Sequence, residues 1–345
     1  MSVFVSGVDG FICKHIVQDL LEQKYNVIGT VRSEAIRDHI LKQFGNNPNL
    51  ILEIVEDISV PNAFDAAIKK HAKEIKYVLH TASPFFFDPK DYVKDLLHPA
   101  VQGTKDILEA IKKYAAEYVE RVVITSSYAA VMNFDREKDN TNVVNEGSWN
   151  PDTWEGCQQN GMRVYCASKA FAEKAAWEFL KENRHAVKFK MSTVNPVFVF
   201  GPQQFDEDVR PKLNTSCEII NSLIHRDPAA PFDSNEIYDS FVDVRDVAKA
   251  HLIAFQKEET IGQRLIMYNC KFASQDIIDV LNEDFPQLKG KVPVGKPHTG
   301  ALDHPLKGVV IDNSKTKKLL GFEFIGLKES VHDTAAQVLR HEGKL

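Results

Sequence analysis

The sequence has few of the features that mark metal, disulfide or membrane proteins. Its five cysteines form no CxxC pair, and neither an HExxH motif nor an EF-hand spacing occurs, so we expect no disulfide framework and no bound metal. No apolar run approaches the ~20 residues that a membrane span needs, and residues 1–6 lack the basic region of a signal peptide. These absences predict a soluble, cytoplasmic protein that does not contact membranes.

An excess of positive charge is also absent. The 345 residues include 42 Lys and Arg against 48 Asp and Glu, giving a net charge of −6, which provides no electrostatic basis for binding nucleic acid. Neither glycine (17) nor proline (15) is enriched, which excludes collagen-like and low-complexity chains. Since no long amphipathic surface helix indicates a dimer, we favour a monomer.

The first half of the chain alternates short apolar runs with stretches of helical periodicity. Between the first two runs, Ile12, Ile16, Leu20 and Leu21 recur at spacings typical of one helix face. Strands that are apolar throughout, joined by helices, are typical of a parallel sheet covered on both faces. We therefore predict an α/β fold, a Rossmann-type doubly wound parallel sheet, with strands near residues 2–6, 26–31, 50–55, 77–81, 121–125 and 188–195.

The second half is less regular and carries several proline-bearing segments. Helical patterns occur at residues 207–225, 244–256, 275–285, 314–320 and 327–341, and Asp243 stands where an N-cap is expected before the second of these. We predict that residues 1–196, with a return segment at about 238–262, form the Rossmann domain. Residues 197–237 and 263–345 then form a smaller C-terminal α/β domain that binds the substrate.

A glycine pair follows the first predicted strand and opens the first helix, in the order Gly7-Val8-Asp9-Gly10-Phe11-Ile12. Gly7 permits a tight turn, and Gly10 lets a pyrophosphate approach a helix N-terminus, where unpaired N–H groups and the helix dipole attract anions. Cys13 occupies the position at which a third glycine is common. The alternative is an ordinary turn, but the strand–turn–helix context favours a dinucleotide site.

The end of the second predicted strand distinguishes between dinucleotides. An NAD site places a carboxylate there to bind the ribose 2′-hydroxyl, whereas this sequence has Arg32, followed by Ser33. A guanidinium is suited to a 2′-phosphate, which it binds through paired charge-assisted hydrogen bonds. With Arg37 as a second positive charge on the next helix, the sequence predicts NADP(H) as cofactor. The alternative is that Arg32 is a solvated loop residue.

Tyr165 and Lys169 are the candidates for reactive chemistry. Their four-residue spacing places both side chains on one face of a predicted helix, where we expect the ammonium to lower the pKa of the phenol and make it a better proton donor. Ser127 follows the fifth predicted strand, at the edge where parallel sheets bind ligands, and its hydroxyl is a candidate to bind a substrate carbonyl. Because side chains alternate in direction there, the neighbouring Ser126 is the structural competitor.

Several motifs occur in the order typical of one enzyme family. They are Gly7-x-x-Gly10, Arg32, His80-Thr81-Ala82-Ser83-Pro84, Ser127-Tyr128, Tyr165-x-x-x-Lys169 and Asn195-Pro196. With residues 165–178 (YCASKAFAEKAAWE) and Phe200-Gly201-Pro202, the chain resembles the extended short-chain dehydrogenase/reductases, within them the dihydroflavonol-reductase-like branch and fungal ketoreductases. The likeness extends to residues 243–251 and 317–322.

The resemblance implies an NADPH-dependent reductase of aldehydes and ketones, including methylglyoxal-like, branched aliphatic and bulkier compounds. It implies a triad in which Ser127 orients the carbonyl, Tyr165 donates the proton, and Lys169 lowers the tyrosine pKa and holds the nicotinamide ribose. The further cofactor contacts that it implies are Gly7, Gly10, Phe11, Ile12, Arg32, Asp57, Ile58, Ala82, Ser83, Pro196, Val199 and Ser216, and the implied substrate pocket is Phe85, Tyr128, Met132, Met162 and Phe198. A family lysine for the 2′-phosphate falls at Ile36, for which Arg37 is the expected substitute.

Two other functions remain open from the sequence. A sugar-nucleotide epimerase or dehydratase on the same scaffold needs cationic groups for a nucleotide diphosphate, and Arg210, Lys212 and Arg226 are scattered candidates. A non-catalytic NADP-sensing module is compatible with the fold, although a sensor has no use for an acidified phenol. We favour the reductase, with a small-molecule carbonyl compound as substrate.

Overall fold

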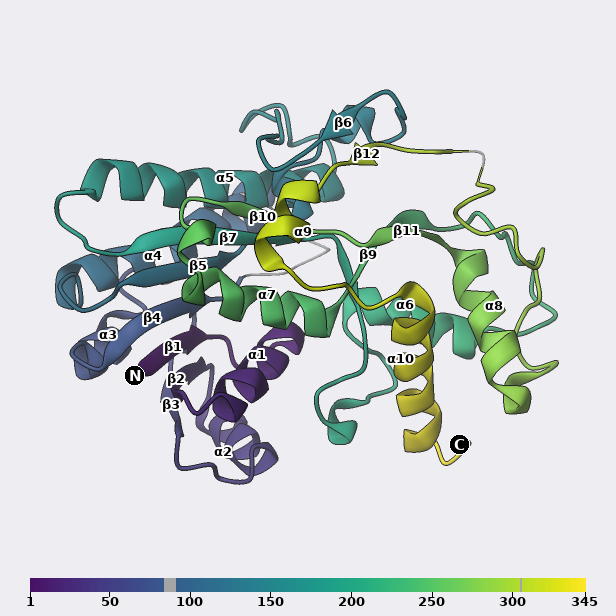
Figure 1. The fold of residues 1–345 in the computed structure, drawn as a ribbon, viewed down its shortest axis with the longest axis horizontal. Helices are drawn as coiled ribbons and strands as arrows, with labels where there is room; N and C mark the ends of the chain where they lie inside the picture. Colours follow the sequence, from purple (N-terminus) through teal and green to yellow (C-terminus); the bar gives the residue numbers. More distant parts are fainter. Residues whose placement is uncertain (84–90, 305) are drawn as a thin grey trace.

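The computed structural model describes residues 1–83, 91–304 and 306–345, and its centre is a seven-stranded parallel sheet (Figure 1). The strands are β1 (Ser2–Ser6), β2 (Asn26–Val31), β3 (Leu50–Ile54), β4 (Ile75–His80), β5 (Arg121–Thr125), β7 (Lys190–Pro196) and β10 (Arg264–Met267). Their order is β10-β7-β5-β4-β1-β2-β3, so the chain winds from β1 to one edge and then from β4 to the other. This arrangement confirms the predicted Rossmann-type fold.

Helices cover both faces of this sheet. One face carries α1 (Phe11–Glu22), α2 (Glu34–Gln43) and α7 (Val244–Gln256), and the other carries α3 (Asp65–His71), α4 (His98–Tyr114) and α5 (Gly161–Asn183). Along β1, Val3 and Val5 pack in the first of these two apolar cores, and Phe4 packs in the second. Because successive side chains point to opposite covered faces, the strands are continuous apolar runs.

A smaller sheet with the order β11-β9-β8 lies beside the large one, on the right in Figure 1. Its strands are β8 (Phe198–Phe200), β9 (Tyr238–Asp243) and β11 (Cys270–Ala273). A third apolar core joins it to α6 (Thr215–Ile224), α8 (Ser274–Asp284) and α10 (Leu327–His341). Because β8 follows β7 almost directly, this sheet begins at the carboxyl edge of the large sheet, where parallel sheets bind ligands.

Short elements complete the fold. β6 (Val143–Val144) pairs with β12 (Val310–Ile311), and α9 (Ser314–Leu320) contacts β10. The single-turn elements are the π-helical turn η1 (Val93–Leu97) and the 3₁₀ turns η2 (Tyr128–Ala130), η3 (Phe134–Arg136), η4 (Asp206–Asp208), η5 (Glu258–Thr260) and η6 (Pro286–Leu288). Within the described residues, no helix combines the length and apolarity needed to cross a bilayer.

Two strands join sheets other than those that the predicted domain boundaries indicate. β10 pairs with β7 in the large sheet, although residues from 263 onward are predicted for the smaller domain. β9 lies in the predicted return segment of the Rossmann domain but pairs with β8 and β11. A short apolar run carries no signal of which sheet it joins, so these two boundaries have to be moved.

The helix predicted over 207–225 begins late, whereas the predicted cap of α7 is confirmed. α6 starts at Thr215, because Pro211 lacks a backbone N–H and restricts Arg210 before it to extended conformations. Asp243 is the N-cap of α7, and its side chain accepts a hydrogen bond from the amide of Arg245. In this sequence the capping residue predicts the start of a helix correctly. The apolar periodicity does not predict the start where the segment contains a proline.

Candidate active site

The glycine turn after β1 has the geometry of an anion site. Gly7 has a φ of +73°, and a Cβ built there would lie 3.1 Å from Cβ of Ala82, so the turn requires glycine at this position. Gly10 is the N-cap of α1 and provides no side-chain cap. The first-turn N–H groups of α1 therefore keep hydrogen-bonding capacity for an external anion, which the helix dipole also favours. A dinucleotide pyrophosphate fits this turn.

The ends of β1 and β4 are joined beside this turn. Ser6 Oγ accepts hydrogen bonds from the amides of Thr81 and Ala82, each at 3.0 Å, and lies 2.9 Å from Nδ1 of His80. Burial, with the nearby Lys169 charge, lowers the pKa of His80 to about 4. The imidazole is therefore neutral and accepts the Ser6 hydroxyl hydrogen at Nδ1. These bonds fix the backbone of Ala82 beside the glycine turn.

Tyr165 and Lys169 lie one turn apart on α5, which begins at Gly161 and is capped by the side chain of Asn160. The Lys169 side chain is buried, and its Nζ lies 5.2 Å from the centre of the Tyr165 ring. The same Nζ donates a hydrogen bond to Ser83 Oγ at 2.5 Å. Lys169 thus connects the phenol on α5 to Ser83, which lies three residues after the carboxyl end of β4.

Burial controls the pKa values of both side chains. It raises the pKa of the Tyr165 phenol above its ordinary value, with Cys166 adding to the shift, and it lowers the pKa of Lys169 to about 8. The predicted net lowering of the tyrosine pKa is therefore wrong in this structure, because withdrawal from water disfavours the charged form of each group and sets the direction of both shifts. Tyr165 consequently keeps its proton, which is the state that a proton donor requires.

Ser126 and Ser127 have different environments beyond β5. Ser126 Oγ donates to the buried Glu173 carboxylate at 2.5 Å, whereas Ser127 is the N-cap of η2 and its Oγ accepts from the Ala129 amide at 3.1 Å. Asn195 Nδ2 donates to the Ser127 carbonyl oxygen at 3.1 Å. A hydroxyl that accepts in this way keeps its own hydrogen for a further acceptor. Ser126 thus has a structural partner in the core, and Ser127 has a hydrogen to donate to a carbonyl.

A buried ion pair lies near Ser127, and the sequence alone does not predict it. Glu173 on α5 and Arg264 on β10 lie 2.5 Å apart at Oε1 and Nε, with side chains 0% and 7% exposed. Further hydrogen bonds to this carboxylate come from Ser126, Trp177, Thr193 and Asn195. The available signal is the position of Glu173 four residues after Lys169 on the same helix face, but its ionic partner is 91 residues away in the sequence.

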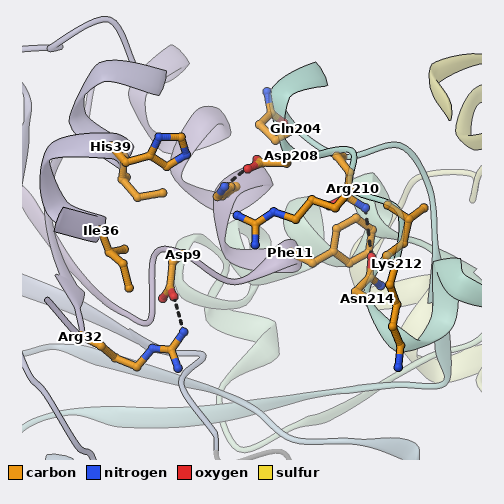
Figure 2. Close-up of a pocket in the computed structure, with 14 residues that line it drawn as sticks. Asp9, Phe11, Arg32, Ile36, His39, Gln204, Asp208, Arg210, Lys212 and Asn214 are labelled. Atoms are coloured by element: carbon orange, nitrogen blue, oxygen red, sulfur yellow. Dashed lines mark hydrogen bonds and ion pairs between the residues drawn. The ribbon is translucent and has the colours of Figure 1, made fainter. Parts of the chain in front are cut away.

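A cavity of about 440 Å³ lies between the glycine turn and the segment before α6 (Figure 2). Arg32 lines it from the end of β2, with Nη2 2.9 Å from Asp9 Oδ2 and a side chain that is 69% exposed. Ile36 lines it as well. Arg37 does not contribute to this lining, and its guanidinium lies 3.0 Å from Asp38. The structure therefore places Arg32 at a cavity and directs Arg37 to a different partner.

The other predicted cofactor residues are distributed along the carboxyl edge. The Asp57 carboxylate accepts from the amide and the hydroxyl of Ser59, and these bonds lower its pKa. Ser216 Oγ accepts from the amide of Val199 at 3.3 Å, and Val199 lies in β8, three residues after the end of β7 at Pro196. Three of the remaining residues lie at the start of α1 or against α4: Phe11, Ile12 and Ile58. Their roles toward a cofactor stay predictions.

The predicted substrate pocket is brought together only in part. Tyr128 and Met132 pack in one apolar cluster, and Tyr128 Oη donates to Glu137 at 3.2 Å. Phe198 packs against the core of the small sheet, and Met162 is 51% exposed. The remaining predicted residue, Phe85, lies outside the described residues.

The three cations considered for a nucleotide diphosphate do not form one site. Arg210 and Lys212 line the cavity beside the glycine turn. Arg226 instead pairs with Glu236 at 2.5 Å. Arg226 thus lies apart from Arg210 and Lys212. These three side chains do not form a shared binding site for a sugar nucleotide.

Residues 3–270 match the NAD dependent epimerase/dehydratase family. The chain belongs to this family. One member, the NADPH-dependent methylglyoxal reductase GRE2 of Saccharomyces cerevisiae, is 58% identical over 345 residues, which are 100% of each chain. The match confirms the family that the motif order from Gly7 to Pro196 predicts.

Solved structures of family members share the fold along the whole chain. The crystal structure of the yeast methylglyoxal/isovaleraldehyde reductase Gre2 complexed with NADPH matches with a TM-score of 0.96 at 58% identity and covers 100% of each chain. The Gre2–NADPH complex from Candida albicans matches with a TM-score of 0.94 at 46% identity and covers 99% of each. The family fold therefore extends beyond the large sheet to the small one.

Proposed function

We propose that this protein reduces aldehydes and ketones to alcohols with NADPH. The observation that carries the proposal is the pairing of the half-buried Tyr165 with the buried Lys169, which lies with Ser83 at the carboxyl edge of the large sheet. A glycine turn suited to a pyrophosphate adjoins this edge. A relative that is 58% identical over its full length is an NADPH-dependent methylglyoxal reductase, which supports both the cofactor and the reaction.

The proton transfer follows from three side chains. Burial keeps Tyr165 protonated, so its hydroxyl donates to the substrate oxygen as that oxygen gains negative charge. Lys169, with a pKa of about 8, is charged at neutral pH and stabilises the developing phenolate. Ser127 donates a hydrogen bond to the same oxygen and orients the carbonyl. The bound dinucleotide supplies the hydride.

The described residues fit NADPH at several points. The uncapped N-terminus of α1, with Gly7 and Gly10, suits the pyrophosphate. Arg32 suits the 2′-phosphate, since its exposed guanidinium has one carboxylate neighbour, Asp9, that a doubly charged phosphate can outcompete. We propose that Lys169 Nζ, which lies next to Tyr165, binds the nicotinamide ribose.

The proposed substrates are small uncharged carbonyl compounds. The side chains expected near the reacting carbon are aromatic or thioether groups, Tyr128, Met132, Met162 and Phe198, which accept apolar substituents and provide no charged clamp. We propose methylglyoxal-like compounds, branched aliphatic aldehydes such as 3-methylbutanal, and bulkier ketones. Turnover of 3-methylbutanal that is slower than that of a charged analogue of equal size would contradict this substrate class.

We also propose that the protein is a cytoplasmic monomer that works with small molecules rather than with nucleic acid or membranes. The net charge of −6 supports the exclusion of nucleic acid, and the five free cysteines suit a reducing compartment. Light scattering during gel filtration should return the chain mass of 39.0 kDa. Twice that mass would establish a dimer instead.

Tyr165→Phe tests the reaction directly. NADPH consumption with 3-methylbutanal, followed by absorbance, should fall by about 10²–10⁴-fold because the proton donor is lost, while NADPH binding measured by fluorescence persists. Tyr25→Phe, at a partly buried ring whose hydroxyl accepts a hydrogen bond from Gln256 Nε2, is the matched control and should turn over like the wild type. Wild-type rates in Tyr165→Phe would refute the assigned acid.

A further inference from the structure

Two ion pairs line the cavity beside the glycine turn, and in each pair the positive and negative charges cancel. Arg32 lies 2.9 Å from Asp9, and Lys14 lies 2.6 Å from Asp208. All four side chains line the cavity (Figure 2). Each pair is neutral, so these four residues alone give the cavity no net charge for an anion.

Arg210 and Lys212 add positive charge that these pairs do not balance. Both line the cavity, and neither forms an ion pair with any residue that the structure describes. Figure 2 shows the Arg210 side chain extending from the segment before α6 into the space between Asp9 and Asp208, whereas the Lys212 side chain extends away from it. The Arg210 guanidinium is therefore the added charge that is directed into the cavity.

The segment that carries Arg210 is held against helices α1 and α2. Asp208 pairs with Lys14 of α1, and each of these side chains is 9% exposed. Phe205 packs edge-to-face on Phe44 at the end of α2, with ring centres 4.9 Å apart. Buried contacts with the first two helices thus hold the backbone before Arg210 in place, so its side chain reaches the cavity from a fixed position.

We propose that Arg210 binds the 2′-phosphate of NADPH together with Arg32. The inference rests on the proposed function, and it adds a specificity residue from outside the glycine turn and β2. A phosphate monoester carries nearly two negative charges at neutral pH, whereas the Arg32 charge is shared with Asp9. A second guanidinium supplies the missing charge and further hydrogen bonds to the phosphate oxygens.

The positions nearer to Arg32 in the sequence do not supply this charge. Ile36 lines the cavity but is apolar. The Arg37 guanidinium lies 3.0 Å from Asp38 and 3.7 Å from Glu34, and Arg37 is not part of the cavity lining. Arg210 thus takes the role that sequence reasoning gives to Arg37.

Binding of nucleotides that differ only in the 2′-phosphate tests the inference. Isothermal titration calorimetry with adenosine 2′,5′-bisphosphate and with ADP compares Arg210→Gln, Lys212→Gln and the wild type in the full-length protein. Arg210→Gln should weaken the bisphosphate about tenfold, the loss expected for a charge-assisted hydrogen bond, and should change ADP affinity less than about twofold. Lys212→Gln removes the same charge two residues away and should leave both affinities within about twofold.

Three results would overturn the inference. They are an unchanged bisphosphate affinity in Arg210→Gln, an equal loss for ADP, or an equal loss in Lys212→Gln, since the last two indicate a general effect of charge. Circular dichroism of each variant verifies that it is folded, and Arg210→Lys should recover part of the affinity. Failure of the proposed function has a separate signature, which is wild-type protein that binds the bisphosphate but does not oxidise NADPH with 3-methylbutanal.

Discussion

The two charge clusters that adjoin the proposed active site are built differently. Glu173 and Arg264, beneath Ser127, have side chains 0% and 7% exposed, whereas Arg32 and Asp9, at the cavity, are 69% and 22% exposed. Salt screens a buried pair weakly, and breaking such a pair leaves an uncompensated charge, while an exposed pair contributes little to stability and exchanges partners readily. The first cluster therefore belongs to the scaffold, and the second is suited to an incoming anion.

The largest expected effect comes from breaking the buried pair. Glu173→Gln should lower the free energy of unfolding by about 3–5 kcal/mol, because the Arg264 guanidinium stays buried without its counter-ion. Urea denaturation measures this loss. Glu117→Gln is the matched control, since its partner Lys188 is 59% exposed and Glu117 itself is 73% exposed. The control should lose less than about 1 kcal/mol, and a similarly small loss in Glu173→Gln would remove the contrast between the clusters.

A pH-dependent effect of up to about 3 kcal/mol is expected from Lys169. Its pKa is about 8 in the folded protein, against an ordinary value of 10.5, so between these pH values the unfolded chain binds the extra proton. The contribution of Lys169 to stability should therefore rise with pH from about 8 to 10.5, whereas the buried cysteines, whose pKa values burial raises, contribute in the opposite direction. His80 is already neutral there, and burial raises the pKa of Tyr165. Urea denaturation of the wild type and Lys169→Met across this range measures both slopes of stability against pH, and the wild-type slope should be the more positive of the two; equal slopes would contradict the pKa of about 8.

The smallest expected effect is at the cavity. Arg32→Ala should raise the KM for NADPH about tenfold at low salt, the loss of one charge-assisted contact, and the difference from wild type should shrink as salt screens the exposed site. Steady-state kinetics at two salt concentrations measure this. Arg136→Ala, which breaks an exposed pair with Asp139, is the control. A wild-type preference for NADH would contradict the role of Arg32.

Local patterns in the sequence predict the parts of this fold that depend on neighbours in the chain. The strands 2–6, 26–31 and 121–125 and the helices 244–256, 314–320 and 327–341 coincide with those in the structure. The helical spacing of Tyr165 and Lys169 is likewise local, as is the cap at Asp243. These features follow from periodicity and capping, which act over a few residues.

Features that depend on burial or on distant partners could not be predicted. The rise in the Tyr165 pKa results from desolvation, which the spacing of Lys169 does not reveal. The Glu173–Arg264 pair joins α5 to β10. The sheet to which β10 belongs is known only from its pairing with β7 in the structure. The position of Arg37 outside the cavity lining depends on the rotation of α2, which a sequence position does not give.

The regular placement of Tyr165, Lys169 and Glu173 along α5 has a mechanical consequence. The single helix α5 carries the Tyr165 hydroxyl, the Lys169 ammonium and the Glu173 carboxylate. This carboxylate connects the helix to β7 through Asn195 and to β10 through Arg264. A disturbance that tilts the helix moves all three together. Their mutual alignment therefore survives small movements of the molecule, and surrounding loops can vary in shape without altering it.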